Sequence, residues 1–160
     1  MTYRNMVVLF FCLLSTAAFS EQTISQRIDQ ETWSVISQSV KDADIKAMAS
    51  TYHPDAVVVS GNETTPISVA LSNWGEGMEK AKTSGASATV LFRFTSRQDD
   101  EMSAFETGIF KYTALDAEGN KSHIFMNFET LLVKKENRWQ FLMERQLTET
   151  DEASWNALKK

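Results

Sequence analysis

The sequence predicts an α+β fold in which helices come first and a curved antiparallel sheet follows. Apolar residues recur at helical spacing in the first half of the chain and at every second position in the second half. The runs of the second half are separated by short segments rich in Gly, Asn, Asp and Lys, which are typical of turns between antiparallel strands. A chain of 160 residues is long enough for one domain.

Residues 1–20 have the pattern of a secretory signal peptide. Arg4 provides the positive charge, Met6–Leu14 is an unbroken apolar run, and Ala18 and Ser20 are small residues before the expected cleavage site. An uncleaved anchor or a buried first helix is the alternative, but the run is shorter than the ~20 apolar residues that span a bilayer. We therefore expect an exported protein, periplasmic or secreted, whose mature domain covers 21–160 and keeps no stable membrane anchor.

Composition argues against several classes of function. Cys12 lies in the expected signal peptide, so the mature chain has no disulfide and no thiol chemistry. The formal net charge of −5 argues against nucleic acid as a partner. His53 and His123 are far apart and have no ligand-spaced carboxylates near them, so we expect neither a metal site nor a cofactor.

Two helices are expected at the start of the mature chain. The first covers about 25–43, where apolar residues form one stripe, and Thr23 with Gln26 forms a capping box ahead of it. Asp44 is the expected N-cap of a second, short helix. Pro54 disfavours helical geometry at the preceding residue, so we expect this helix to end there.

A short strand, a loop and a third helix follow. The strand covers 56–60, the loop covers 61–66, and the helix runs over about 68–83 with Trp74 on its apolar side. Gly85 is the expected helix stop.

Four long strands complete the domain. Gly108, in the second of them, is a candidate β-bulge. Trp155 and Leu158, in the polar C-terminal tail, are candidates for docking onto the body of the domain. The expected strands cover 88–96, 102–115, 122–134 and 138–148.

The strand at 122–134 is largely apolar on both faces, since apolar side chains occupy both odd and even positions. An antiparallel sheet with one wet face shows a clean alternation instead. The helices cover only one face, so we expect the other to meet a second copy of the chain. The sequence therefore predicts a homodimer that forms through the sheet face.

The order of elements, with a few local motifs, resembles the SnoaL-like, ketosteroid-isomerase-like superfamily, which includes nuclear transport factor 2. The likeness covers nearly all of the mature chain. It is carried by Asp44-Ile45-x-Ala47, Tyr52-x-x-Asp55-Ala56-Val57, Gly108 and Asn137-Arg138-Trp139. The resemblance implies a cone, formed by a curved antiparallel sheet packed on three N-terminal helices, with an apolar pocket inside. Members include isomerases, cyclases, dehydratases and binders without catalysis, so the resemblance implies fold more than function.

A residue-by-residue comparison with ketosteroid isomerase argues against that activity. Ser60 stands where the isomerase has its aspartate base, and Ile36 stands where it has a tyrosine donor. Glu129 stands where it has a protonated aspartate. The resemblance therefore implies a pocket that keeps one acidic position and lacks the isomerase base.

Glu129 and Glu144 are the candidate catalytic residues. Glu129 has apolar neighbours along its strand, so a buried carboxylate with general acid–base chemistry is one interpretation. Pairing with Arg93, Arg145 or Lys111 is the other. Glu144 is expected to converge with Glu129 at the mouth of the cone, although a bulge would change which face of the last strand lines the pocket.

The remaining candidates are ligand-binding side chains. Tyr52 lies on the apolar stripe of its helix, whereas the adjacent His53 points elsewhere. The full set of candidate ligand-binding residues is Tyr52, Ser60, Trp74, Asn127 and Gln146. We expect an exported domain that binds a small apolar or amphipathic molecule. An enzyme that uses pocket carboxylates and a protein-interaction module are the alternatives.

Overall fold

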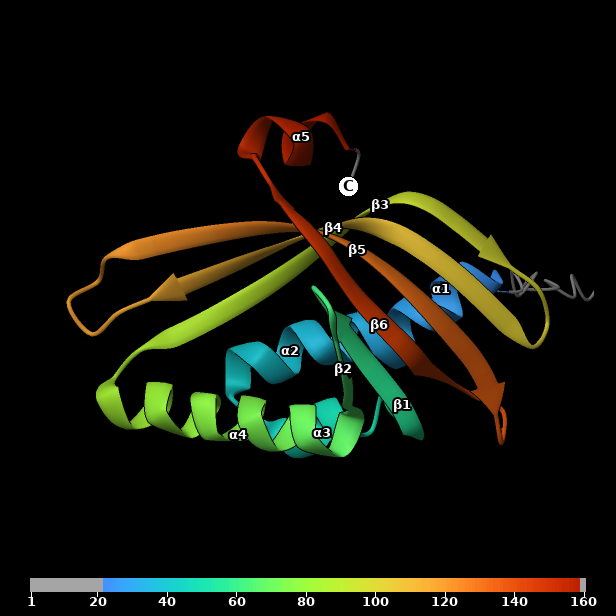
Figure 1. Cartoon of the computed structure of the whole chain (residues 1–160), viewed down its shortest axis with the longest axis horizontal. Helices are drawn as coiled ribbons and strands as arrows, with labels where there is room; N and C mark the ends of the chain where they lie inside the picture. The colour runs from blue at the N-terminus through green and yellow to red at the C-terminus, as the bar shows by residue number, and fades with distance from the viewer. Residues whose placement is uncertain (1–21, 159–160) are drawn as a thin grey trace, which may run out of the picture.

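A curved, open six-stranded sheet arches over the helices of the first half of the chain (Figure 1). The computed structural model describes residues 22–158. The expected signal peptide at 1–20 lies outside the described residues. Within 22–158, no helix combines the length and the apolar character needed to cross a bilayer.

The sheet contains the four predicted long strands as an antiparallel meander. Strands β1 (Tyr52–Ser60) and β2 (Glu63–Pro66) extend it at one edge, in the order β2-β1-β6-β5-β4-β3. The β1 strand runs parallel to β6. The expected loop at 61–66 is wrong, because Gly61 turns with a φ of 58° and lets β2 pair with β1. The long strands are β3 (Ser87–Asp99), β4 (Ser103–Leu115), β5 (Lys121–Lys135) and β6 (Arg138–Thr150).

The first predicted helix is continuous in space but has a π-helical segment at its centre. It consists of α1 (Ile24–Ile28), the π segment η1 (Asp29–Trp33) and α2 (Ser34–Asp42). The predicted capping box is confirmed: the Gln26 amide donates to Thr23 Oγ1 at 3.2 Å, and the Thr23 amide donates to Gln26 Oε1 at 2.9 Å.

The second helix begins where it was predicted to begin, but it ends before the residue preceding Pro54, where its end was predicted. Asp44 Oδ1 accepts hydrogen bonds from two backbone amides at the start of α3 (Ile45–Ala49), each at 3.0 Å. The helix does not continue to Pro54, because the Thr51 carbonyl already accepts a hydrogen bond from β6 at 2.9 Å. Pro54 therefore lies within β1. The pairing of β1 with β6 is interrupted between Tyr52 and Val57, so the amide hydrogen that proline lacks is not required for a hydrogen bond between these strands.

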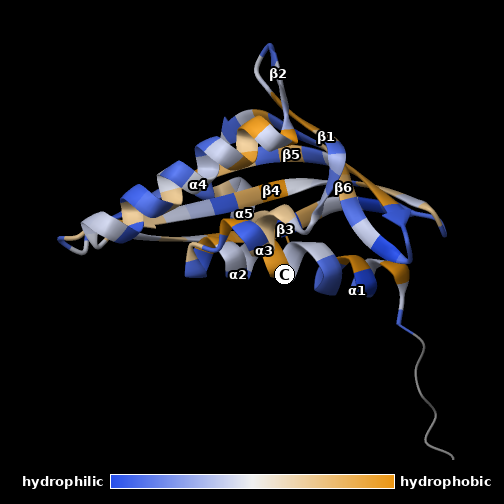
Figure 2. Ribbon diagram, turned by 90° about the horizontal axis from the view of Figure 1, so that it is seen from below, coloured by the Kyte–Doolittle hydropathy of each residue, from blue (hydrophilic) through white to orange (hydrophobic). Residues whose placement is uncertain are grey.

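The third helix, α4 (Ile67–Ser84), is two-sided, as Figure 2 shows from the alternation of hydrophobic and hydrophilic residues along it. It ends at Gly85, which has the left-handed φ of 78° expected of a helix stop. This helix, α2 and α3 all lie on the same side of the sheet (Figure 1). We call the sheet face toward them the inner face.

The other sheet face, the outer face, is partly covered by the C-terminal helix α5 (Glu152–Ala157). Trp155 is buried there against Phe125, and the Arg93 guanidinium lies 4.3 Å from the centre of the Trp155 ring. The docking expected for Trp155 is therefore confirmed. Beyond α5, the register aligns a row of apolar side chains across four strands, which we call the outer row: Val57, Met143, Leu131 and Phe105.

Gly108 is required where β4 passes close to its neighbours. A Cβ atom at this position would lie 2.2 Å from the Arg93 carbonyl oxygen and 3.0 Å from the Phe128 ring. The bulge expected here lies in the opposite strand, because Phe94 pairs with Gly108 and Ser96 with Thr107, which leaves Thr95 as the extra residue.

Candidate functional site

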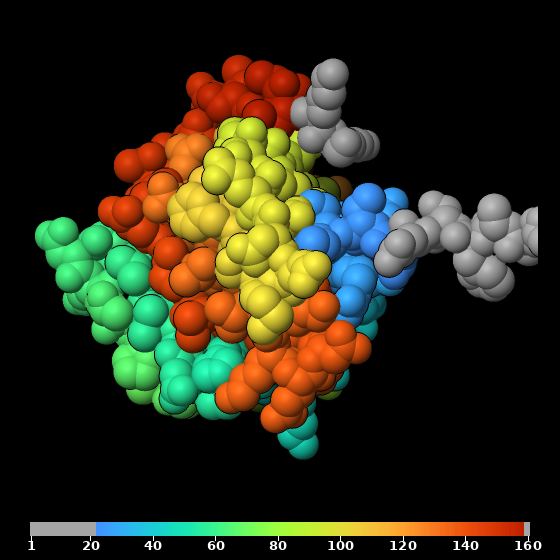
Figure 3. Space-filling model, turned by 90° about the vertical axis from the view of Figure 1, so that its right-hand side faces the viewer, coloured from blue at the N-terminus to red at the C-terminus, as the bar shows by residue number. Residues whose placement is uncertain are grey.

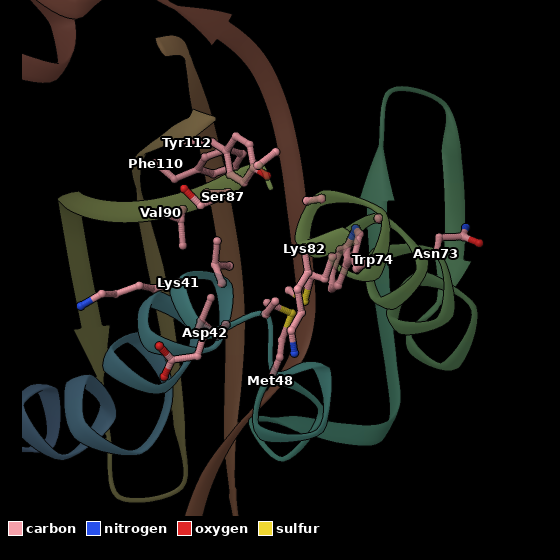
Figure 4. A pocket seen from close by; sticks show the side chains of 18 of the residues that line it. Lys41, Asp42, Met48, Asn73, Trp74, Lys82, Ser87, Val90, Phe110 and Tyr112 are labelled. Atoms are coloured by element: carbon pink, nitrogen blue, oxygen red, sulfur yellow. The ribbon is translucent and has the colours of Figure 1, made fainter. Parts of the chain in front are cut away.

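A cavity of about 560 Å³ lies between the inner face of the sheet and helices α2, α3 and α4. Most of its wall is apolar, and its size falls in the range of small-molecule sites. In Figure 4, Phe110 and Tyr112 of the sheet lie above Lys41 and Asp42 of α2, and Trp74 of α4 lies to their right. The sheet side includes Val90, Phe110 and Tyr112, and the helix side includes Met48, Trp74 and Met78.

The cavity contains one cluster of polar side chains in hydrogen-bond contact, which we call the polar cluster: Tyr52, Glu144 and Gln146. The Tyr52 hydroxyl donates to Glu144 Oε2 at 2.6 Å, and the Gln146 amide donates to Glu144 Oε1 at 3.0 Å. All three side chains line the cavity. The cluster thus presents a carboxylate held by two neutral donors within an apolar wall.

A β-bulge in β6 places Glu144 in the cavity. Leu132 pairs with Phe141 and Leu131 with Met143, which leaves Leu142 as an extra residue. Phe141 is buried on the inner face. After the bulge the alternation changes phase, so Glu144 and Gln146 also face inward. Without the extra residue, Met143 would occupy the inner face and Glu144 the outer one.

Tyr52 is buried at the start of β1. Its side chain is 5% exposed, and its ring packs against Phe141 and Trp74 with centroid separations of 5.2 and 6.1 Å. Burial, together with the negative charge of Glu144 and the hydrogen bond to it, raises the pKa of the Tyr52 hydroxyl well above its ordinary value. The hydroxyl therefore stays protonated at neutral pH and keeps its proton directed at Glu144.

The structure brings together four of the seven candidate site residues. Tyr52, Trp74, Glu144 and Gln146 line the same cavity. Ser60, Asn127 and Glu129 are not among the residues that line it.

The expected convergence of Glu129 with Glu144 is wrong. Glu129 pairs with Arg145 across the strands, on the outer face, and Arg145 Nη1 lies 3.3 Å from Glu129 Oε2. Thr130, not Glu129, is opposite Glu144. The geometry matches the other interpretation of Glu129, in which it pairs with a basic side chain on an adjacent strand.

Asn127 and Ser60 also lie away from the cavity. Asn127 is on the outer face, where its amide donates to the Thr148 carbonyl oxygen at 3.2 Å. Ser60 is exposed at the end of β1, where the chain turns into β2. The His53 ring is also engaged elsewhere: its Nδ1 accepts from the Asp55 amide at 3.1 Å, and its Nε2 lies 3.1 Å from Lys135 Nζ.

Sequence reasoning missed a second inner-face carboxylate, Glu106. It is fully buried between Arg97, whose Nε donates to it at 2.7 Å, and the Trp33 indole, which donates at 2.6 Å. Arg97 also pairs with Asp29 at 2.7 Å, which ties η1 to the β3–β4 hairpin. Figure 3 shows the N-terminal helical segment, in blue, lying beside this hairpin, in yellow. The sequence did contain a signal for it: Glu106 lies two positions after Ala104 in the same strand, and is therefore a charged residue on an otherwise apolar strand face.

Over residues 22–158, no group of three or more His, Cys, Asp or Glu side chains is arranged to hold a metal ion. The polar cluster contains a single carboxylate, whereas protein metal sites combine several ligands. The chemistry open to the cluster is therefore hydrogen bonding, charge pairing and proton transfer.

Solved structures share this architecture. An NTF2-like protein from Shewanella oneidensis superposes with a TM-score of 0.63 at 14% identity, over 76% of this chain and 97% of the other. The chain has the nuclear transport factor 2-like fold. An NTF2-like superfamily protein from Salmonella enterica gives a TM-score of 0.64 at 14% identity, over 79% and 92% of the two chains.

A third NTF2-like protein, from Cytophaga hutchinsonii, gives a TM-score of 0.58 at 8% identity, over 72% of this chain and 91% of the other. No protein-family model matches the sequence, and no curated protein matches it. The nuclear transport factor 2-like fold predicted from the order of elements is thus confirmed, and the function has to be argued from the cavity.

Proposed function

We propose that this protein is an exported domain that binds a small apolar or amphipathic molecule in the cavity. The observation that carries the proposal is an apolar cavity of about 560 Å³ with one polar cluster. Apolar walls with a few well-placed polar groups are typical of small-molecule sites, because burial supplies affinity and the polar groups fix orientation.

Filling the cavity tests the proposal. Ala88 lines the cavity, whereas the adjacent Thr89 is exposed. A neutral fluorescent probe, N-phenyl-1-naphthylamine, should bind the wild-type protein with increased emission. Ala88→Phe should weaken binding by at least about tenfold, or about 1.4 kcal/mol. Thr89→Phe is the matched control and should leave binding unchanged. Equal binding by both variants would contradict the proposed site.

Export is part of this proposal and rests on the pattern of residues 1–20. Protein purified from the native host should be found outside the cytoplasm. Its intact mass should equal that of a chain that starts at Glu21. An intact mass that includes Met1, in a cytoplasmic fraction, would rule out the signal peptide.

We further propose that a second copy of the chain covers the outer row. Phe105 is 38% exposed, and the row is continuous across four strands and lies outside the area covered by α5. Contiguous apolar surface of this kind favours association between copies. Both largely apolar faces of β5 are then accounted for.

Phe105→Glu tests this association, since it places a charge in the row. Light scattering should give a dimer for the wild-type protein and a monomer for the variant. Leu91→Glu is the control, because Leu91 is 55% exposed and lies outside the row. A monomeric wild-type protein would exclude the dimer, and a complex of mixed mass would instead favour an interaction module.

Acid–base catalysis is the second candidate function. The 2.6 Å hydrogen bond between Tyr52 and Glu144 joins a donor to a proton acceptor inside a cavity, which is an arrangement that enzymes use. The protein would then speed exchange of the α-protons of cyclohexanone in heavy water, measured by NMR, and Glu144→Gln would abolish that effect. No acceleration by the wild-type protein would leave binding as the role.

A further inference from the structure

The hydrogen bonds of the polar cluster specify which ligand group is complementary to it. Glu144 accepts one bond on each oxygen, from Tyr52 and from Gln146, and each oxygen keeps a free lone pair. The Tyr52 proton is already committed to Glu144, so this hydroxyl offers only its lone pairs to a ligand. The cluster therefore presents an excess of acceptors, and a ligand group that donates fits it best.

Among the residues that the structure describes, no cation pairs with the charge of the cluster. The ion pairs formed within residues 22–158 involve other carboxylates: Asp29, Glu31, Glu106 and Glu129. Glu144 has only neutral partners. A carboxylate in an apolar wall loses hydration, and a positive charge within hydrogen-bond distance offsets that loss.

The walls of the cavity also suit a cation. Trp33, Trp74, Phe92, Phe110 and Tyr112 all line it. The Trp74 ring lies 6.1 Å from that of Tyr52, which places an aromatic surface next to the carboxylate. Aromatic rings attract ammonium groups through the negative potential of their faces and also bury apolar carbon.

The charged residues at the mouth do not reverse this preference. Lys41, Asp42 and Lys82 border the cavity and are exposed to solvent. In Figure 4 the Lys41 side chain points away from Phe110 and Tyr112. Exposed charges are screened by water and salt, whereas Glu144 acts inside the apolar wall.

We propose that the ligand is a hydrophobic amine, whose ammonium group donates to Glu144 and Tyr52 while its apolar body packs against the aromatic walls. This inference rests on the proposed small-molecule function and names the class of molecule. It assigns Glu144 as the residue that selects positive charge.

Three ligands with the same apolar body test it: 4-phenylbutylamine, 4-phenylbutanol and 4-phenylbutyrate. Calorimetry on the wild-type protein should show the amine binding at least about tenfold more tightly than the alcohol. The carboxylate should bind most weakly. Glu144→Gln keeps the shape of the side chain and removes its charge. It should reduce the affinity for the amine by at least about tenfold and the affinity for the alcohol by a smaller factor, so that the preference for the amine is lost.

Glu129→Gln is the matched control, because it removes a carboxylate of the same sheet outside the cavity. It should retain the preference for the amine. Equal binding of amine and alcohol to the wild-type protein would overturn the charge selection alone, and this comparison needs no variant. A preference for the amine that survives in Glu144→Gln would overturn the role of Glu144. Binding of none of the three ligands would contradict the proposed function as well.

Discussion

Two glutamates on the inner face of one sheet have opposite environments. Glu106 is fully buried and accepts hydrogen bonds from the Arg97 guanidinium and the Trp33 indole at 2.7 and 2.6 Å. Glu144 lies in a cavity and accepts hydrogen bonds from two neutral donors. The same residue type is thus closed off in one region and left open to a ligand in the other.

The difference separates a structural carboxylate from a functional one. Burial raises the pKa of the Glu106 carboxyl, and the Arg97 guanidinium and Trp33 indole oppose that shift. Every oxygen of Glu106 is engaged by a partner that also holds a secondary-structure element in place. Within residues 22–158 Glu144 has no such cation, so its unused acceptor capacity is available to a molecule from outside.

The largest effect is expected for Glu106→Ala, which removes the centre of the closed network. Arg97 loses one of its two carboxylate partners and the Trp33 indole loses its acceptor. Loss of one partner of a buried ion pair costs about 3–5 kcal/mol. Urea denaturation should show a decrease of this size in the free energy of unfolding. A decrease below about 1 kcal/mol would mean that the network is not structural.

Gly108→Ala is expected to have the next largest effect, because Gly108 lies on β4 between Glu106 and the cavity. The added methyl group would meet the Arg93 carbonyl oxygen and the Phe128 ring. Overpacking of this kind costs about 1–3 kcal/mol. Thermal unfolding measures it, and Gly77→Ala is the control, since a Cβ there meets nothing within 4 Å. Equal unfolding temperatures of the two variants would contradict the close approach.

Tyr52→Phe should cost about 1 kcal/mol at pH 7, because it removes one buried hydrogen bond. The pKa of Tyr52 is raised in the folded state above its ordinary value of 10.0, so its contribution is fully present below that pH. The contribution is lost as the pH rises through the folded pKa. The stability difference between wild type and variant should therefore stay constant up to about pH 10 and decrease as the pH rises further toward the folded pKa. A constant difference would show that Tyr52 does not titrate as its burial requires.

The smallest effect is expected for Glu144→Ala. The free energy of unfolding should change by less than about 1 kcal/mol, because no protein cation is left unpaired and the cavity can hydrate the Tyr52 hydroxyl. Urea denaturation alongside Glu106→Ala is the measurement. A loss as large as that of Glu106→Ala would remove the distinction between the two glutamates.

Local signals in the sequence were sufficient for most of the architecture. The capping box at Thr23 and the N-cap at Asp44 were predicted and are present, because both depend on side chains within three residues of the amides they satisfy. Gly85 ends α4 for a similarly local reason. The order of helices and long strands followed from hydrophobic periodicity, which is also a local property.

The errors lie where partners distant in sequence decide. The helix expected to reach Pro54 ends early because β6 takes the Thr51 carbonyl. The expected loop at 61–66 forms a strand because β1 offers it an unpaired edge. Neither partner can be seen within the segment itself.

The candidate site shows the same division most clearly. Periodicity along the chain identified Tyr52, Trp74, Glu144 and Gln146 as candidates, and residue type alone indicated hydrogen bonding and charge. Whether Glu144 faces the cavity depended on the extra residue Leu142, whose position is set by the pairing of β6 with β5. One added residue reverses the inward and outward positions of all that follow. Glu144 therefore reaches the cavity because of strand register, which is a property of the assembled sheet.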